Sequence, residues 1–270
     1  MASSTMTSTV KSQKLLKTSV NIWFTVVVVG QFIFALYILG LYGVNGLAGD
    51  FERWNNSTPH GYVPKDIWGN ILFGVHMALA AVITIGGPLQ LMKKVRTKFP
   101  RFHRINGRIY ITSAFAISLA GLYLAWMRSM AGGLAGSIFI TINGILIMTC
   151  AFYAVKYAIA RKLTSHRKWA IRLFLAMSGV WFFRVFLMAW IMINQGPIGF
   201  DMETFQGPAL NVMYTCSYIL PVIFAGFYFK AKESSLPKTK RVISIFILFL
   251  TVYIAIGTAV ATMGMWLPSL

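Results

Sequence analysis

"VNIWFTVVVVGQFIFALYILGLY", Val20–Tyr42, contains no charged side chain and is long enough to cross about 30 Å of hydrocarbon as an α-helix. Its apolar residues run continuously rather than in alternation, which favours a helix that pairs its own backbone groups over a strand. Six further stretches of this kind follow: Ile71–Met92, Ile109–Met127, Gly136–Val155, Trp169–Asn194, Ala209–Phe229 and Val242–Met263. The sequence therefore predicts an all-α fold, a polytopic membrane helix bundle with seven transmembrane helices.

The basic residues, which give the chain a net charge of +19, are distributed unevenly between these stretches. Of the 25 Lys and Arg residues, three precede the first stretch, seven lie between the second and third, six surround the fourth-to-fifth connection, and five lie between the sixth and seventh. The opposite segments hold only Arg53, Lys65 and Arg128. Because Lys and Arg favour cytoplasmic loops, we expect the N-terminus in the cytoplasm and, after seven spans, the C-terminus outside.

The charge and the composition also indicate the partners. Apolar residues make up 57% of the chain and charged residues only 11%, so we expect an integral, multi-pass protein of the cell membrane. Basic loops at a membrane surface attract anionic headgroups, which makes membrane lipids the expected partners. The positive charge is explained by topology and does not imply nucleic acid binding.

The spans divide the chain into one membrane domain with short ends. Residues 1–19 are rich in Ser, Thr and Lys and are expected to form a disordered cytoplasmic tail. Residues 20–263 form the seven-helix domain, and residues 264–270 a short outer tail. The longest outer segment, 43–70, mixes aromatic residues, Pro, Gly and both signs of charge, which predicts a folded cap whose Trp54 and Trp68 sit at the membrane interface.

Two similar motifs stand directly before membrane spans. HRINGR begins at His103 before the third span, and HRKWAIR begins at His166 before the fifth. Both spans run from inside to outside, so the two histidines start at the same edge of the membrane and can reach the same depth. Arg184 follows His166 after five full helical turns, which places it on the same helix face about 27 Å away.

Two ionisable side chains lie well inside the spans, His76 in the second and Arg184 in the fifth. Such groups are costly in lipid and tend to face a partner or a cavity. Their depths are comparable, so we expect one shared ligand-binding site. Asp201, Glu203 or an acidic group of a ligand is the candidate anion beside them, and a purely structural pair of Arg184 with a carboxylate is the alternative.

The motifs together resemble a known family. GPLQLMKKVRTKFPRFHRINGRIYI (Gly87–Ile111) and SHRKWAIRLFLAMSGVWFFR (Ser165–Arg184), with GVHMALA upstream, are similar to the predicted membrane proteins called domain of unknown function 2306. The matching positions are His76, Gly87, Pro88, His103, Arg104, Gly107, Arg108, His166, Arg167, Trp169, Arg172 and Arg184, with Trp169 one residue later than in the family pattern. The resemblance covers about Gly74 to Arg184 and implies a membrane fold without an established chemistry.

The paired histidines suggest haem b as a cofactor. Imidazoles on facing helices can ligate haem iron axially, and the arginines nearby could bind its propionates. The candidate iron ligands are His103 and His166, and the candidate propionate partners are Arg104, Arg108, Arg167 and Arg172. This placement is similar to one half of the diheme transmembrane cytochromes b. A second haem would pair His76 with a histidine of the fourth span, which has none, so diheme electron transfer is disfavoured.

Three functions remain open at this point. One is a haem- or quinone-binding redox protein that uses His103 and His166. The second is a carrier or sensor of a small amphiphile or anion through His76 and Arg184. The third is a non-catalytic membrane assembly protein whose basic groups contact headgroups. Zinc-protease, serine-hydrolase and phosphate-loop motifs are absent from the sequence, and whether the protein is an enzyme stays open.

The distribution of basic residues makes the topology testable. A reporter fused after Leu270 should lie outside the cell, whereas a reporter inserted between Lys230 and Arg241 should lie inside. The measurement is labelling of each reporter by a reagent that does not cross the membrane. An internal C-terminus would contradict an odd number of spans.

Overall fold

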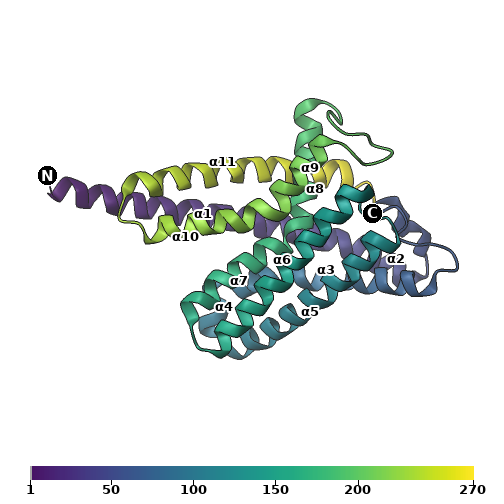
Figure 1. The fold of residues 1–270 in the computed structure, drawn as a ribbon, viewed down its shortest axis with the longest axis horizontal. Helices are drawn as coiled ribbons and strands as arrows, with labels where there is room; N and C mark the ends of the chain where they lie inside the picture. Colours follow the sequence, from purple (N-terminus) through teal and green to yellow (C-terminus); the bar gives the residue numbers. More distant parts are fainter. Residues whose placement is uncertain (1) are drawn as a thin grey trace.

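The protein is an all-helical bundle in the computed structural model, which describes the backbone of residues 2–270 and the side chains of residues 8–270 (Figure 1). The α-helices are α1 (Ala2–Ile38), α2 (Asn45–Ala48), α3 (Ile67–Leu91), α4 (Lys93–Lys98), α5 (Pro100–Met127), α6 (Gly133–Ile159), α7 (Leu163–Met177), α8 (Gly179–Asn194), α9 (Pro208–Tyr214), α10 (Leu220–Glu233) and α11 (Pro237–Ala261). Three π-helical segments, η1 (Leu39–Val44), η3 (Thr215–Ile219) and η4 (Thr262–Trp266), and the 3₁₀ segment η2 (Phe51–Asn56) complete the order.

The predicted membrane helix bundle is confirmed. Within the described residues, six helices are long and apolar enough to cross a membrane, and the bent pair of α7 and α8 makes a seventh if it crosses as one span. The pair bends by 49° at Ser178. Sharp kinks in helices occur at Ser and Gly pairs, and Ser178 is followed here by Gly179. The segment predicted as the fifth span is therefore a pair of helices that meet at a bend, rather than one straight helix.

The bend divides the bundle into two groups of helices. In Figure 1, α1, α10 and α11 run side by side, and α3, α5, α6 and α7 form a second, inclined group. Helix α7 packs on α6 and also touches α10, whereas α8 crosses over to pack on α11 and η3. Helix α1 contacts both α11 and α3 and so joins the two groups.

Residues 8–19 are helical, not disordered as expected. They form early turns of α1, in which Ser12, Leu16 and Ser19 are buried. Leu16 packs in one cluster with Ala231 of α10 and Ile247 of α11. The sequence of this segment is polar, but its buried face is held by tertiary contacts, which commonly override local composition. Met1, also part of the expected tail, lies outside the described residues.

The segment 43–70, which the sequence predicts on the outer side, is a folded cap attached to the end of α5. Arg128 forms an ion pair with Asp66 at 3.2 Å, and its guanidinium also donates to Gly61 O at 3.2 Å and to Asn70 Oδ1 at 2.7 Å. Trp54, expected at the membrane interface, is instead only 5% exposed and donates to Tyr42 O. Its indole therefore belongs to the core, while Trp68 stays exposed.

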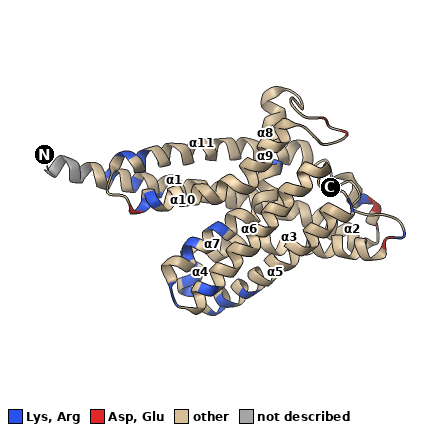
Figure 2. Ribbon diagram, in the orientation of Figure 1, with Lys and Arg blue, Asp and Glu red and all other residues tan. Residues whose placement is uncertain are grey.

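The charges separate along the bundle. Figure 2 shows Lys and Arg gathered at the ends of α1, α4, α7, α10 and α11 that lie on one side, and Asp and Glu mostly at the opposite end. We call the first side the basic end. This arrangement agrees with the distribution from which the topology was predicted, and the compartment that the basic end faces stays a prediction.

Close helix contacts depend on particular glycines. A Cβ atom at Gly257 of α11 would lie 2.3 Å from the backbone oxygen of Val185 in α8. Real Cβ atoms do not approach a carbonyl oxygen this closely, so α8 and α11 can pack as they do only with glycine at this position. At Gly226 of α10, by contrast, the nearest atom would be Arg172 Nη2 at 3.9 Å, an ordinary contact.

This difference predicts opposite effects of two alanine substitutions. Gly257→Ala should destabilise the protein by about 1–3 kcal/mol, because the backbone of α8 has to move. Gly226→Ala should be neutral or slightly stabilising, since alanine is the better helix former. Thermal unfolding of both variants in the same detergent measures the effect. Equal unfolding temperatures for the two variants would contradict the close approach of α8 and α11.

Candidate functional site

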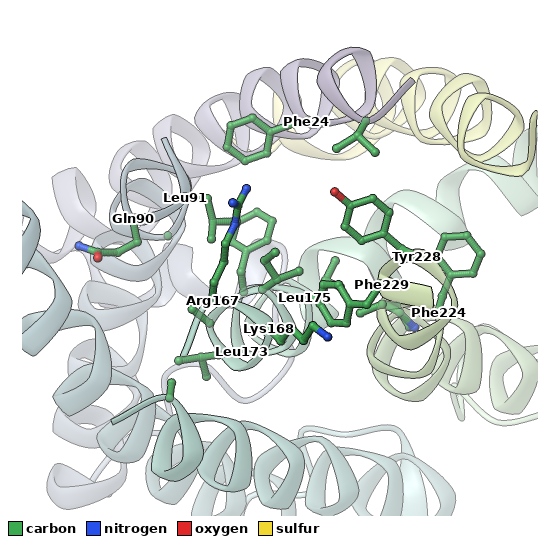
Figure 3. A pocket seen from close by; sticks show the side chains of 18 of the residues that line it. Phe24, Gln90, Leu91, Arg167, Lys168, Leu173, Leu175, Phe224, Tyr228 and Phe229 are labelled. Carbon is green, nitrogen blue, oxygen red and sulfur yellow. The ribbon is translucent and has the colours of Figure 1, made fainter. Parts of the chain in front are cut away.

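The two helix groups enclose a cavity of about 2370 Å³. Its wall is formed by α1, α3, α7, α10 and α11, as the close-up in Figure 3 shows, and residues of α4, α5, α6, α8, α9 and η3 also line it. It begins at the basic end and continues along α10 to Val212 and Met213 of α9. The position follows from the bend at Ser178, because α8 moves away from α7 and toward α11.

The interior wall of the cavity is mostly apolar. In Figure 3, side chains from four helices converge on the open space, among them Phe24 of α1, Leu91 of α3, Leu175 of α7 and Phe224 of α10. Several residues of the wall are buried, for example Leu173 and Phe182. A space with such walls is suited to hydrocarbon rather than to a polar ligand.

The mouth of the cavity, at the basic end, is cationic. The cations that line it are Lys93, Lys94, Arg96, Arg104, Arg108, Arg167, Lys168 and Lys232. Among the described lining residues, Glu233 is the only acid, and its Oε1 lies 2.6 Å from Nζ of Lys168. This ion pair joins α7 to α10, and both partners are too exposed for it to contribute much stability.

Arg167 and Arg172 have different surroundings, although both lie in the same motif. The Arg172 guanidinium lies 5.0 Å from the ring centres of both Trp169 and Phe229, so it is clamped between aromatic rings of α7 and α10. The Arg167 side chain extends across the cavity toward Phe24 and Leu91 (Figure 3). Among the described residues, Arg167 has no hydrogen bond, ion pair or ring contact.

The structure brings His103 and His166 together at the mouth. Both line the cavity and lie close enough to interact electrostatically, and Arg96 acts on His103 in the same way. The Nδ1 atom of His166 is 2.9 Å from Ala154 O, which holds the ring and leaves Nε2 for another partner. The Nδ1 atom of His103 is buried without a hydrogen bond. Arg104 and Arg108 line the same mouth.

His76 and Arg184 do not touch each other in this structure. His76 of α3 packs on α5, where a Cβ at Gly121 would lie 3.3 Å from its Cε1 atom. The Arg184 guanidinium of α8 lies 5.6 Å from the ring centre of Phe34 in α1. The bend at Ser178 is the reason that the predicted straight stripe from His166 to Arg184 does not form, since it turns α8 away from α7.

Neither of the carboxylates expected beside Arg184, those of Asp201 and Glu203, forms an ion pair with it in the described part of the chain. Asp201 accepts hydrogen bonds from the backbone N–H of Thr204 at 2.7 Å and from its hydroxyl at 2.8 Å, and these bonds lower the pKa of Asp201 below its usual range. No ion pair of Arg184 is found in the part of the chain that the structure describes.

The surroundings of Arg184 include a feature that sequence reasoning missed. Tyr42 of η1 and Tyr218 of η3 interact electrostatically with its guanidinium, and Trp266 of η4 packs at 5.2 Å on Phe34, the ring that Arg184 covers. All three π-helical segments thus supply aromatic side chains around this arginine. Such segments are rare and are frequent at functional sites, but no residue pattern in the sequence announced them.

No group of three or more His, Cys, Asp or Glu side chains that could hold a metal ion occurs among the described residues. A family model described as "Predicted membrane protein (DUF2306)" matches residues 73–228, which is more than half of the chain. The matched range includes the three candidate site histidines and the five candidate site arginines named above. No curated protein and no solved structure gives a significant match.

The contact of Arg184 with Phe34 can be measured by a double-mutant cycle. Arg184→Met and Phe34→Leu should show a coupling free energy of about 0.5–2 kcal/mol, the range of a cation–π contact. A second cycle of Arg184→Met with His76→Ala should show little coupling, because these side chains share no contact. Unfolding in detergent supplies the free energies. Strong coupling between Arg184 and His76, without coupling between Arg184 and Phe34, would support the shared site that was expected from the sequence.

Proposed function

We propose that this chain, which belongs to the DUF2306 family of predicted membrane proteins, binds an amphiphile with an anionic head group in the cavity described above. The role that fits such binding is that of a carrier or sensor of the amphiphile. The site is the cavity between α1, α3, α7, α10 and α11 rather than the pair of His76 and Arg184.

The observation that carries this proposal is Arg167. Arg167 is an exposed residue of the cationic mouth, its guanidinium with five N–H donors extends toward the apolar wall, and no described residue of the chain pairs with it. Tyr228 and Lys232 lie close enough to interact with it electrostatically, and the second of these adds positive charge. A phosphate or carboxylate would accept its donors in charge-assisted hydrogen bonds, and the apolar wall would hold the rest of the molecule.

The charge of the mouth supports the same ligand class. Eight cations and one acid line it, and that acid is already paired with Lys168. A neutral amphiphile would gain nothing from this excess, whereas an anionic one is attracted and oriented with its head group at the basic end. A small anion without a hydrocarbon part could bind at the mouth, but it would make no contact with the apolar wall.

Removing the Arg167 charge should weaken binding selectively. Arg167→Gln should lower the affinity for a fluorescent lipid with a phosphate head group by about tenfold or more, the loss expected for one hydrogen bond to a charged group. The measurement is a titration of the purified protein in detergent, with a zwitterionic lipid carrying the same fluorophore for comparison.

The matched control is Arg101→Gln. Arg101 is an exposed cation of α5 that does not line the cavity, so this change removes the same charge from the basic end without touching the site. Its affinity should equal that of the parent. An equal loss of lipid affinity in both variants would mean that the affinity depends only on the general positive charge of the surface. An unchanged affinity in Arg167→Gln would contradict the proposed site.

Haem b is a second candidate ligand of the same mouth, favoured by one specific observation. His103 and His166 face the same space, and the hydrogen-bonding distance from His166 Nδ1 to Ala154 O is the kind of contact that orients an iron-ligating imidazole. Arg104, Arg108 and Arg167 are the cavity-lining residues that would hold the propionates. Arg172 is held between two rings and does not line the cavity. A bound haem would give the site its redox chemistry.

Spectra distinguish this candidate directly. If both histidines are axial ligands, protein purified from haem-sufficient cells should show a reduced-minus-oxidised spectrum of a low-spin b-type haem, and His103→Ala and His166→Ala should each abolish it. The parent and both variants are compared at equal amounts of folded protein. A well-folded parent without a Soret band would leave only the anionic amphiphile.

A further inference from the structure

Besides its mouth at the basic end, the cavity is continuous with the outer surface of the bundle at a second place. Five apolar residues of α10 and α11 line the cavity and are at the same time open to the surroundings of the protein. They are Leu220, Ile223, Phe227, Phe246 and Phe249, with exposed fractions of 45%, 51%, 53%, 43% and 66%. A side chain that belongs to both surfaces marks an opening between them, and here that opening lies on the sides of two membrane helices.

Two aromatic contacts lie on either side of the opening. Nearer the basic end, the rings of Phe224 in α10 and Phe246 in α11 lie 4.8 Å apart. Farther along, the rings of Phe186 in α8 and Tyr253 in α11 lie 5.6 Å apart. All four residues line the cavity, and Leu250 of α11 lies between the two contacts along its helix. We call this opening, bordered by α8, α10 and α11, the window.

We propose that the window admits an acyl chain of a membrane lipid from the bilayer into the cavity. This rests on the proposed binding of an anionic amphiphile and names its class and route: a long-chain lipid with an acidic head group, which enters from the side. The window lies in helices that are surrounded by hydrocarbon, so the molecule that meets it is the tail of a lipid.

The chemistry of the border supports this occupant. The residues around the window are Phe186, Cys216, Leu220, Phe224, Phe246, Leu250 and Tyr253, so a polar solute would find hardly any hydrogen-bonding partner there. From Leu220 at the window to Lys232 at the mouth, α10 rises by about 18 Å at 1.5 Å per residue. A ligand that reaches both has to carry its charge at one end and a long apolar chain at the other.

Narrowing the window should slow exchange without abolishing binding. Leu250→Trp places a larger ring at the border, and we expect the exchange rate of a bound fluorescent phosphate-headed lipid with unlabelled vesicles to fall by about tenfold. Its equilibrium affinity should stay close to that of the parent. Val252→Trp, on the same helix but exposed and away from the cavity, is the matched control and should exchange at the parental rate.

A reversible cross-link gives a second measurement that does not depend on tolerance of tryptophan. Phe224→Cys and Phe246→Cys are combined with Cys150→Ala and Cys216→Ala, loaded with the same lipid and joined by a short reducible linker. The joined protein should retain the lipid, and reduction should restore its release. Exchange at the parental rate in both Leu250→Trp and the joined protein would overturn the window. A parent protein that binds no phosphate-headed lipid would instead overturn the proposed function.

Discussion

The break of the fifth span at Ser178 is the constraint on which the arrangement of the bundle depends. Ser178 Oγ donates to Phe174 O at 2.8 Å and accepts from Gln31 Nε2 at 2.7 Å, so the hydroxyl at the break finds its partners inside the protein rather than in lipid. A Cβ at Gly179 would lie 2.6 Å from the Tyr218 ring, so the next residue has to be glycine for η3 to pack there. Helix α7 can therefore stay with α6 while α8 leaves for α11, and the cavity occupies the space between the two groups.

The cations of the chain fall into two kinds when their partners are compared. Arg128 binds a carboxylate, a side-chain amide oxygen and a backbone carbonyl, Arg172 lies between two aromatic rings, and Lys168 forms an ion pair with Glu233. These groups hold helices and the cap of residues 43–70 in place. Arg167 has no such partner among the described residues and extends into a cavity. The distinction separates basic residues that build the fold from those that line the cavity without such a partner in the described part of the chain, Arg104, Arg108 and Arg167 among them, although all of them look alike in the sequence.

The fold could be predicted from the sequence wherever the properties of a single helix determine the structure. The candidate site could be predicted where two helices run in the same direction and bring their residues to the same end of the bundle. Long apolar runs such as Val20–Tyr42 are helices for reasons of length and hydrogen bonding alone. The meeting of His103 and His166 follows from the parallel course of their spans. Residues 8–19 and Trp54 behaved differently from prediction because their environment comes from tertiary contacts. The bend, the π-helical segments and the cavity depend on how helices pack against each other, which no spacing of residues within one helix reveals.

The basic end has a consequence for the lipids that surround the protein. Each Lys or Arg near an anionic membrane surface contributes about 1 kcal/mol of attraction, and this attraction fades within a Debye length of roughly 8 Å at physiological ionic strength. Lys11, Lys14 and Lys17 of α1 are exposed. Figure 2 shows the basic residues of α10 near those of α1, and the basic residues of α4 and α7 in the second helix group on the same side of the bundle. In a membrane that contains acidic lipids, together they would enrich these lipids around the bundle. The local concentration next to the protein, rather than the average composition of the membrane, is then the quantity that governs which headgroups it meets.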